Sequence, residues 1–486
     1  MIPPTVQQMM EEAVAHHTAG RLKEAETIYR QVLTQNPVHP DALNLLGMLA
    51  QQCGKLEAAS ELNGRAVALH PEVPEFRYNF GAALAAQGRL DQAMAQYRMA
   101  IELRPNHAEA HNNLGVIHYQ FGDAEQAVEL HRKAIELQPH LASAYNNLSN
   151  ALLALGDVDG ALNACREALA RDANFAQAHL SLGMLLLMNG DFTQGFEEYE
   201  WRWKLMPLAL QAPRTSRPFW DGGPLDGKRI LIYDEQGFGD TIQFARFLPH
   251  VNERGGKILL ACQREMLPLL SGMKGIEKVF AKDSLCPEFD VHCPLLSLPR
   301  VLKLTLENIA ARDAYISAEA QRQERWKERL GEHDGRLKVG LVWAGRDTPD
   351  LRRCMALGEM APLAQVAGVR FISLQTGHAA RQIASAGFSV GNWTGELTDF
   401  AETAGLIANL DLVVTIDTAA AHLAAAMGKP TWILLKSAAD WRWMKDRSDS
   451  PWYPTARLFR QERRGEWSAP ISAAAEALKA VAANKC

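Results

Sequence analysis

Long apolar segments are missing from this chain. No run of apolar residues approaches the ~20 that a membrane-spanning helix needs, and the N-terminal residues lack a basic segment followed by an apolar one. We therefore expect neither a membrane span nor a secretory signal. The 7 cysteines are scattered, with no CxxC pair and no spacing typical of a metal site. Unpaired thiols of this kind indicate a cytoplasmic location.

Several enzyme motifs are also absent. The sequence contains no GxxxxGK[ST], no HExxH and no GxSxG, and its GFGD turn at 237–240 differs from GxGxxG. These absences argue against P-loop nucleotidases, zinc proteases, hydrolases with a nucleophile elbow and NAD-dependent enzymes. A formal net charge of −5 gives no reason to expect nucleic acid as a partner. A length of 486 residues predicts two or three domains.

What the first two hundred residues do contain is a repeat. Glycines recur every 34 residues, and a second glycine series, a proline series and an alanine series keep the same spacing: Gly20, Gly54, Gly88, Gly122, Gly156, Gly190; Gly47, Gly81, Gly115, Gly183; Pro37, Pro71, Pro105, Pro139; Ala25, Ala59, Ala93, Ala127, Ala161. This is the period of the tetratricopeptide repeat (TPR). The spacing predicts an all-α solenoid over 1–205, with five full repeats and an atypical sixth at 176–205 that docks onto the next domain.

Each series has a structural reason. The glycine of the first series is expected to end helix A in a left-handed conformation, which needs no Cβ. The alanine allows helix B to pack closely on helix A. The proline cannot continue helix B and so separates one repeat from the next.

Three asparagines occupy one repeat position on helix A. Asn79, Asn113 and Asn147 are 34 residues apart, and helix A lines the concave face of a TPR solenoid. An amide side chain can bind the backbone of an extended peptide without reading its sequence. This row resembles the asparagine ladder of the O-GlcNAc transferase TPR superhelix, which implies contact with an acceptor polypeptide. Hydrogen bonds between neighbouring helices are the alternative.

After a proline-rich linker at 206–228, strands alternate with helices. Apolar runs at 229–236, 257–262 and 277–280 predict one parallel sheet, and runs at 338–345, 370–375, 411–417 and 430–436 predict a second. We expect two Rossmann-type domains, at 229–335 and 336–486, in a GT-B-like arrangement. The fold class is therefore α plus α/β. A ligand should lie in the cleft beyond the carboxyl ends of the strands.

The first candidate site follows the first predicted strand. Gly237 and Gly239 allow a sharp turn that approaches a ligand closely, and Asp240 opens the next helix. Glycosyl transfer by inversion needs a base that takes the proton of the acceptor, and Asp240 is the candidate. An N-cap role alone would also explain an aspartate at this place.

The second candidate site follows the predicted strand at 411–417. Asp417 and Thr418 lead into a helix that begins with Ala419 and Ala420. The free N–H groups and the dipole of such a helix favour an anion, and small side chains let a diphosphate come close. His422, one turn further on, fits either a phosphate contact or a buried core histidine.

The third candidate site follows the Trp-Ala-Gly turn at 343–345. Arg346, Arg352 and Arg353 lie in this loop, and guanidinium groups have the charge and geometry that phosphate oxygens require. We expect one of them to bind the leaving nucleotide and the others to be surface charges. Gln375, which ends the run at 370–375, is a candidate for the base pocket.

Two of these motifs resemble those of ADP-heptose transferases. The first match is carried by the Gly-Asp pair at 239–240 and by Phe-Leu-Pro at 247–249. The second is the segment 417–423, which resembles the Asp-Thr-Gly-x-x-His-Leu signature of that family with Ala419 in place of the glycine. The resemblance implies that Asp240 is the catalytic base and that the second motif contacts the sugar nucleotide. It also places Arg353 nearest to the basic position of the family.

The whole chain resembles bacterial TPR-linked glycosyltransferases. This implies that a nucleotide-sugar, with no metal and no other cofactor, supplies a sugar to a Ser or Thr hydroxyl of a protein held by the solenoid. The architecture alone suggests flagellin as that protein. Two other functions stay open: a TPR adaptor with a degenerate transferase half, and a transferase that acts on lipopolysaccharide.

Overall fold

The computed structural model describes residues 4–205, 213, 215–309, 314–331, 334–345 and 353–483. The chain forms two compact units, Met1–Ala178 and His179–Cys486. Helix α11 (Ala176–Met188) begins just before this boundary, so most of the predicted sixth repeat belongs to the second unit. The finer domain limits inferred from the sequence remain predictions.

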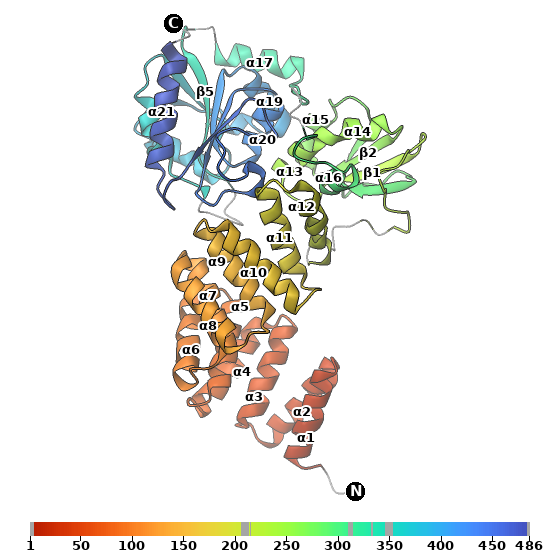
Figure 1. Cartoon of the computed structure of the whole chain (residues 1–486), viewed down its shortest axis with the longest axis vertical. Coiled ribbons are helices and arrows are strands. Elements are labelled where there is room, and N and C mark those ends of the chain that lie inside the picture. The colour runs from red at the N-terminus through yellow and green to blue at the C-terminus, as the bar shows by residue number, and fades with distance from the viewer. Residues whose placement is uncertain are drawn as a thin grey trace. The chain divides into compact units, whose positions relative to one another are not determined.

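The first unit consists of helical pairs that follow the period of the sequence (Figure 1). Its helices are α1 (Val6–Thr18), α2 (Leu22–Gln35), α3 (Pro40–Gln52), α4 (Leu56–Leu69), α5 (Pro74–Ala86), α6 (Leu90–Leu103), α7 (Ala108–Phe121), α8 (Ala124–Leu137), α9 (Ala142–Ala154) and α10 (Val158–Arg171). Each helix packs against the next one along the chain.

The repeated residues do what their chemistry suggests. The six glycines of the first series have φ angles between 73° and 92°, the left-handed region in which a side chain is strained. All five alanines of the series are 0% exposed, which lets paired helices approach closely. Each repeat proline lies two residues beyond the end of a helix B, as Pro37 does after α2. The predicted all-α solenoid is confirmed.

The second unit opens with the sixth repeat and a small parallel sheet. The repeat comprises α11, α12 (Phe192–Tyr199) and the short helix η1 (Glu200–Lys204). The sheet has the order β3-β2-β1-β4, with β1 (Arg229–Tyr233), β2 (Lys257–Cys262), β3 (Ile276–Ala281) and β4 (Val291–Pro294). Its helices are α13 (Phe238–Phe244), α14 (Leu248–Glu253), α15 (Leu267–Leu270) and α16 (Leu298–Val301).

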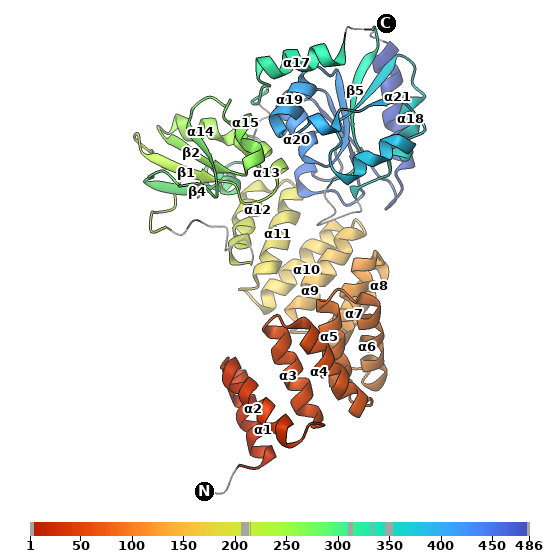
Figure 2. The ribbon, with the colours of Figure 1, turned by 180° about the vertical axis from the view of Figure 1, so that it is seen from behind.

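A larger parallel sheet follows, with the order β10-β9-β8-β5-β6-β7. Its strands are β5 (Leu337–Val342), β6 (Val369–Ser373), β7 (Val390–Gly391), β8 (Leu412–Ile416), β9 (Thr431–Leu435) and β10 (Ala456–Arg460). Helices α17 (Ala320–Leu330), α18 (Ala361–Ala364), α19 (Phe400–Ala408), α20 (Ala419–Ala426) and α21 (Ser468–Ala483) accompany it. Figure 2 shows helices on both faces of this sheet, with α19 and α20 on the side opposite α21. The predicted α plus α/β class is confirmed.

The order of the strands indicates where each sheet can bind a ligand. In the larger sheet β5 pairs with β6 on one side and β8 on the other, with Val339 opposite Leu412. In the smaller sheet β1 pairs with β2 and with β4. The loops that leave β1, β5 and β8 are therefore at the switch points where open parallel sheets bind ligands. No helix among the described residues is long and apolar enough to cross a bilayer.

Candidate functional site

A cleft of about 1280 Å³ lies at the carboxyl ends of strands from both sheets. Every predicted catalytic or donor-binding residue that the structure describes lines it: Asp240, Gly237, Gly239, Arg353, Gln375, Asp417, Thr418, Ala419, Ala420 and His422. Arg346 and Arg352 lie outside the described residues. The fold thus brings together three motifs that are far apart in the sequence.

Asp240 is tied to the turn that precedes it. The backbone N–H of Gly237 donates a hydrogen bond to Oδ2 of Asp240 at 2.9 Å. Gly237 is the N-cap of α13 and Asp240 is the third residue of that helix. The N-cap role that the sequence allowed for Asp240 is therefore wrong in position, because this side chain reaches back to the cap from within the first turn. Its Oδ1 atom is left for another partner.

That partner is Arg442, which the sequence did not predict. Its Nη2 donates to Oδ1 of Asp240, and its Nη1 donates to Oδ1 of Asp440 at 2.8 Å. The guanidinium is 7% exposed and lies over the ring of Trp441, 4.4 Å from the ring centre. Burial opposes the charge, but the two carboxylates raise the pKa of Arg442 well above its ordinary value. The only sequence signal is its place in the aromatic-rich segment after β9.

Asp417 faces the same cleft in a different electrostatic setting. Burial and the negative charge of Asp440 raise the pKa of Asp417. The pKa of Asp440 is lowered instead, because the positive charge and hydrogen bonds of Arg442 outweigh the effect of burial. Asp417 thus accepts a proton more readily than a free aspartate. A protonated carboxyl can lie beside an anionic ligand without repelling it.

The N-terminus of α20 opens into the cleft. Thr418 is its N-cap, but the Thr418 side chain bonds to no helix N–H; its hydroxyl is 3.1 Å from that of Thr415. The first-turn N–H groups, at Ala419 and Ala420, have no intrahelical acceptor. Their small side chains leave the backbone accessible. The arrangement suits an oxyanion of a diphosphate, which the helix dipole would stabilise by ~0.3–2 kcal/mol.

His422 lies where α20 meets α13. Nδ1 of His422 is 2.9 Å from the hydroxyl of Tyr453, and the imidazole stacks on Trp443 at 5.2 Å between ring centres. A Cβ on Gly239 would come within 2.8 Å of Cδ2 of His422, so only glycine fits at that position. Burial lowers the pKa of His422 to about 3, so the ring is neutral at physiological pH. The residue is both a buried core histidine and part of the cleft lining.

Arg353 and Gln375 differ in how much of their side chains is free. Nε of Arg353 has no hydrogen-bond partner among the described residues, and a Cβ on Gly345 would lie 3.0 Å from it. The amide of Gln375, by contrast, is fully used: Oε1 accepts from the N–H groups of Trp343 and Ala344, and Nε2 donates to the Ala344 carbonyl. Gln375 joins the loops after β5 and β6, and its contact with a base stays a prediction.

The repeat asparagines make the hydrogen bonds between neighbouring repeats that the sequence allowed, and their contact with a peptide stays a prediction. Nδ2 of Asn79 donates to Asn44, Nδ2 of Asn147 donates to Asn112, and Nδ2 of Asn113 donates to Tyr78, all across adjacent repeats at 3.0 to 3.2 Å. The Oδ1 atoms of the three ladder residues accept no hydrogen bond from the described residues. They therefore remain available to the N–H groups of a bound peptide.

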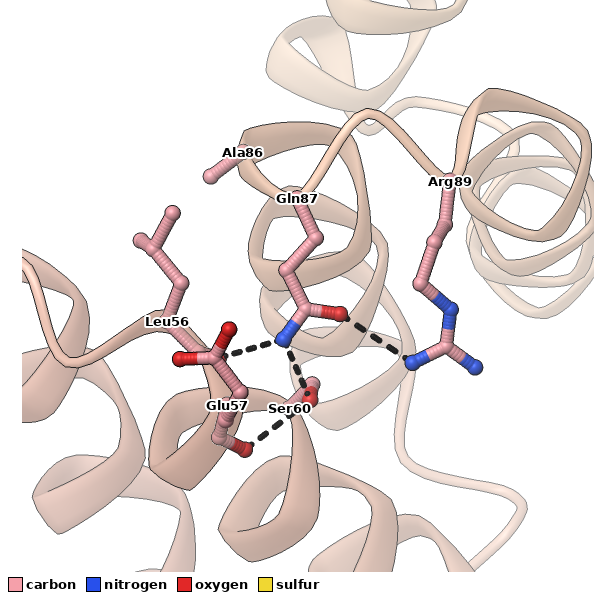
Figure 3. Close-up of a pocket in the computed structure, with 6 residues that line it drawn as sticks. All are labelled: Leu56, Glu57, Ser60, Ala86, Gln87 and Arg89. Carbon is pink, nitrogen blue, oxygen red and sulfur yellow. Dashed lines mark hydrogen bonds between the residues drawn. The ribbon is translucent and has the colours of Figure 1, made fainter.

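A second, smaller recess of about 580 Å³ lies between two repeats of the first unit (Figure 3). The amide of Gln87 donates to the Leu56 carbonyl at 2.7 Å and to the Ser60 hydroxyl at 2.8 Å. Arg89 in turn donates to Oε1 of Gln87 at 3.1 Å. Because these polar groups bond to one another, they hold the neighbouring repeats together, and the recess needs no ligand to account for them.

Comparison with protein families matches the N-terminal helical part and the C-terminal α/β part of the chain to different families. Residues 16–78, 81–122 and 107–174 match tetratricopeptide repeat families. Residues 376–462, which carry Asp417, His422 and Arg442, match glycosyltransferase family 9 (heptosyltransferase). These matches support a chain that combines TPR repeats with a glycosyltransferase region. Among the residues that the structure describes, no three His, Cys, Asp or Glu side chains are arranged to hold a metal ion. Metal-independent transfer stays a prediction.

Among curated proteins, this chain is similar to Protein FlbA of Caulobacter vibrioides. The two are 30% identical over 319 residues, a match that covers 60% of this chain and 53% of FlbA, so the chain spans about half the length of that relative. Among solved structures, MamA is 25% identical over 34% of this chain and 96% of its own, with a TM-score of 0.30. TTC0263, a thermophilic TPR protein of Thermus thermophilus, is 23% identical over 38% of this chain and 100% of its own, with a TM-score of 0.34.

Proposed function

We propose that this protein transfers a sugar from a nucleotide-sugar to a Ser or Thr hydroxyl of a protein that its repeats bind. One observation carries the proposal. The cleft is lined by a carboxylate, Asp240, that belongs to the smaller sheet and its helices. It is also lined by the N-terminus of α20 and by Arg353, which belong to the larger sheet. A transferase needs a base for the acceptor on one side and charge stabilisation for the leaving phosphate on the other.

In the proposed reaction Asp240 takes the proton of the acceptor hydroxyl. The oxygen attacks the anomeric carbon, and the bond from that carbon to the donor phosphate breaks with inversion. The negative charge that grows on the departing diphosphate is met by the N–H groups at the start of α20 and by Arg353. These groups are fixed before the reaction begins, so they stabilise charge without reorganising. Such a site needs no metal ion.

The repeats supply the proposed acceptor site. The Oδ1 atoms of Asn79, Asn113 and Asn147 recur once in each repeat, and each can accept a hydrogen bond from an N–H group of an extended peptide. Backbone contacts of this kind hold many sequences, so the repeats would present a segment rather than select one side chain. Flagellin is the first acceptor to test, because TPR-linked transferases that modify flagellin share this architecture. The reaction would take place in the cytoplasm.

The test compares lysates of cells that express the wild-type chain, Asp240→Asn, or Asn79→Ala/Asn113→Ala/Asn147→Ala. Intact-mass analysis of protein and of lipopolysaccharide detects the transferred sugar. We expect glycosylated protein only with the wild-type chain. Sugar found on lipopolysaccharide, with the asparagine variant as active as wild type, would replace the protein acceptor with a glycolipid. An unmodified lysate together with a cellular phenotype that Asp240→Asn does not change would make the protein an adaptor.

A further inference from the structure

The sixth repeat uses one repeat position in a different way from the others. Tyr29, Asn63, Tyr97, His131 and Cys165 stand at this position, 34 residues apart, and the next member is Tyr199. In the second, third and fourth repeats the side chain (Asn63, Tyr97 or His131) lies under the glycine of helix A. A Cβ on Gly81, for example, would lie 2.8 Å from the ring of Tyr97. In the sixth repeat a Cβ on Gly183 would meet the backbone nitrogen of Tyr199, at 2.8 Å. The ring of Tyr199 is directed elsewhere.

Tyr199 points to the loop that carries Asp240. It is the last residue of α12, is 4% exposed, and bonds through its hydroxyl to both atoms of the Gln236 amide, at 2.9 Å to Nε2 and 3.2 Å to Oε1. Gln236 lines the cleft and directly precedes Gly237, whose N–H holds Asp240. The ring of Tyr199 packs edge-on against Trp441, with 5.9 Å between ring centres.

A second side chain of the sixth repeat forms hydrogen bonds with the same loop. Arg202, in η1, is 0% exposed and donates through Nη2 to Oε1 of Glu235 and to the Ser297 hydroxyl, both at 2.8 Å. Its Nη1 donates to Oε1 of Glu200 at 2.7 Å. Two consecutive residues of the loop, Glu235 and Gln236, are thus fixed by the repeat.

The repeat also holds the segment that carries Arg442. Phe192 stacks on Trp452 at 5.5 Å between ring centres, and Phe196 packs edge-on against Trp441 at 6.0 Å. The backbone N–H of Lys445 donates to the Met188 carbonyl at 3.3 Å. The sixth repeat therefore contacts the two segments whose side chains form the Asp240–Arg442 ion pair.

From these contacts we infer that Tyr199 is a positioning residue of the transferase site and that the sixth repeat is a structural part of that site. The inference rests on the proposed function for its catalytic consequence. The hydroxyl fixes Gln236, and so the turn from Gly237 to Asp240, while the ring supports Trp441 beside Arg442. Tyr199 itself contacts no substrate.

The test is Tyr199→Phe in the full chain, which keeps the ring and removes the hydroxyl. The matched control is Tyr29→Phe, the same change at the same repeat position in the first repeat. The first readout is amide hydrogen exchange at residues 237–241 without ligand. We expect exchange in Tyr199→Phe about fivefold to tenfold faster, the effect of one lost hydrogen bond, and no change in the control. Gln236→Ala should cause the same increase, and the double variant no more than either one.

The second readout is the transfer reaction. We expect kcat to fall about tenfold in Tyr199→Phe, with the donor KM within about twofold of wild type, because the donor contacts lie on the loops after β5 and β8. Unchanged exchange in Tyr199→Phe would overturn the inference. So would an equal loss of melting temperature, donor affinity and kcat, which a merely structural residue would cause. If the wild-type chain binds no nucleotide and transfers no sugar, the proposed function fails, and the exchange comparison still decides whether Tyr199 positions the loop.

Discussion

Nη2 of Arg442 donates a hydrogen bond to Oδ1 of Asp240, and this ion pair connects the smaller sheet to the larger one across the cleft. Asp240 is on α13, directly after β1, whereas Arg442 is in the segment after β9. Nη1 of the same arginine donates to Asp440. A buried guanidinium thus bridges two carboxylates that line the cleft. Under the proposed function, an incoming diphosphate has to share Arg442 with Asp240 or draw it away.

The role of Asp240 as a base predicts a specific kinetic loss. Asp240→Asn keeps an oxygen that can accept the Gly237 N–H but cannot take a proton from the acceptor. We expect kcat for transfer to fall at least ~100-fold, while the nucleotide still raises the melting temperature. Asp440→Asn removes a carboxylate of the same network and should cost less than about tenfold. A retained tenth of the wild-type rate in Asp240→Asn would rule out the base.

The Arg442 network predicts a stability loss in the second unit. Arg442→Gln removes a buried cation from the half-buried carboxylates of Asp240 and Asp440, and we expect the free energy of unfolding to fall by about 1.5–3 kcal/mol, the range for hydrogen bonds to charged groups. Urea unfolding followed by tryptophan fluorescence measures this, because all 11 tryptophans follow residue 200. The control is Arg447→Gln, whose pair with Asp449 is partly exposed and should contribute no more than about 1 kcal/mol. Equal losses in the two variants would contradict the account.

Close packing of α13 on α20 predicts that Gly239 tolerates no side chain. In Gly239→Ala the new methyl group meets the ring of His422, which Tyr453 and Trp443 hold in place. We expect a loss of about 1–3 kcal/mol in the same fluorescence-detected unfolding, together with weaker nucleotide binding. Gly358→Ala is the comparison, because a Cβ there meets nothing within 4 Å. A fully stable Gly239→Ala would show that the helices can separate.

A buried histidine predicts acid sensitivity of the first unit. Burial lowers the pKa of His131 to about 4, against about 6.5 for a free histidine. Below pH 6.5 the unfolded chain binds a proton that the folded chain does not, so stability falls as the pH drops towards 4, by up to about 3 kcal/mol.

His131→Asn should flatten that pH dependence, measured by circular dichroism during thermal unfolding. The fold accommodates asparagine at this repeat position, because Asn63 occupies it in the second repeat. The exposed His70 serves as the control: His70→Asn should leave the wild-type slope unchanged. A slope in His131→Asn as steep as that of wild type would place the acid sensitivity elsewhere.

The repeat half could be predicted almost completely, because its period locates the start and end of each helix pair. The predicted strand at 257–262 coincides with β2, and the other predicted runs overlap β1, β3, β5, β6, β8 and β9. The strands β4, β7 and β10 were not predicted. β4 has four residues and β7 has two, too few to show a hydrophobic period. Neighbouring strands in the sheet, rather than local sequence, decide these elements.

The site was predictable only where a motif is local. Gly237, Asp240, Asp417 and Thr418 follow strands directly, and their residue types indicate what they can bind. Arg442 lies 202 residues from its partner Asp240, and one sequence gives no sign of such a pair. Gln375 lines the cleft as predicted, but nothing in the sequence indicated that its amide would bond to the backbone groups of Trp343 and Ala344.

The proposed function requires the cleft to bind a nucleotide, and thermal unfolding of the purified chain with UDP, GDP, ADP, CMP or CDP tests this requirement most directly. At 100 times its dissociation constant, one of them should stabilise the second unit by ~2.7 kcal/mol. The account predicts that Arg353→Gln removes this effect and that Arg457→Gln, on β10, keeps it. No stabilisation by any of the five nucleotides, or an equal effect in both variants, would contradict it.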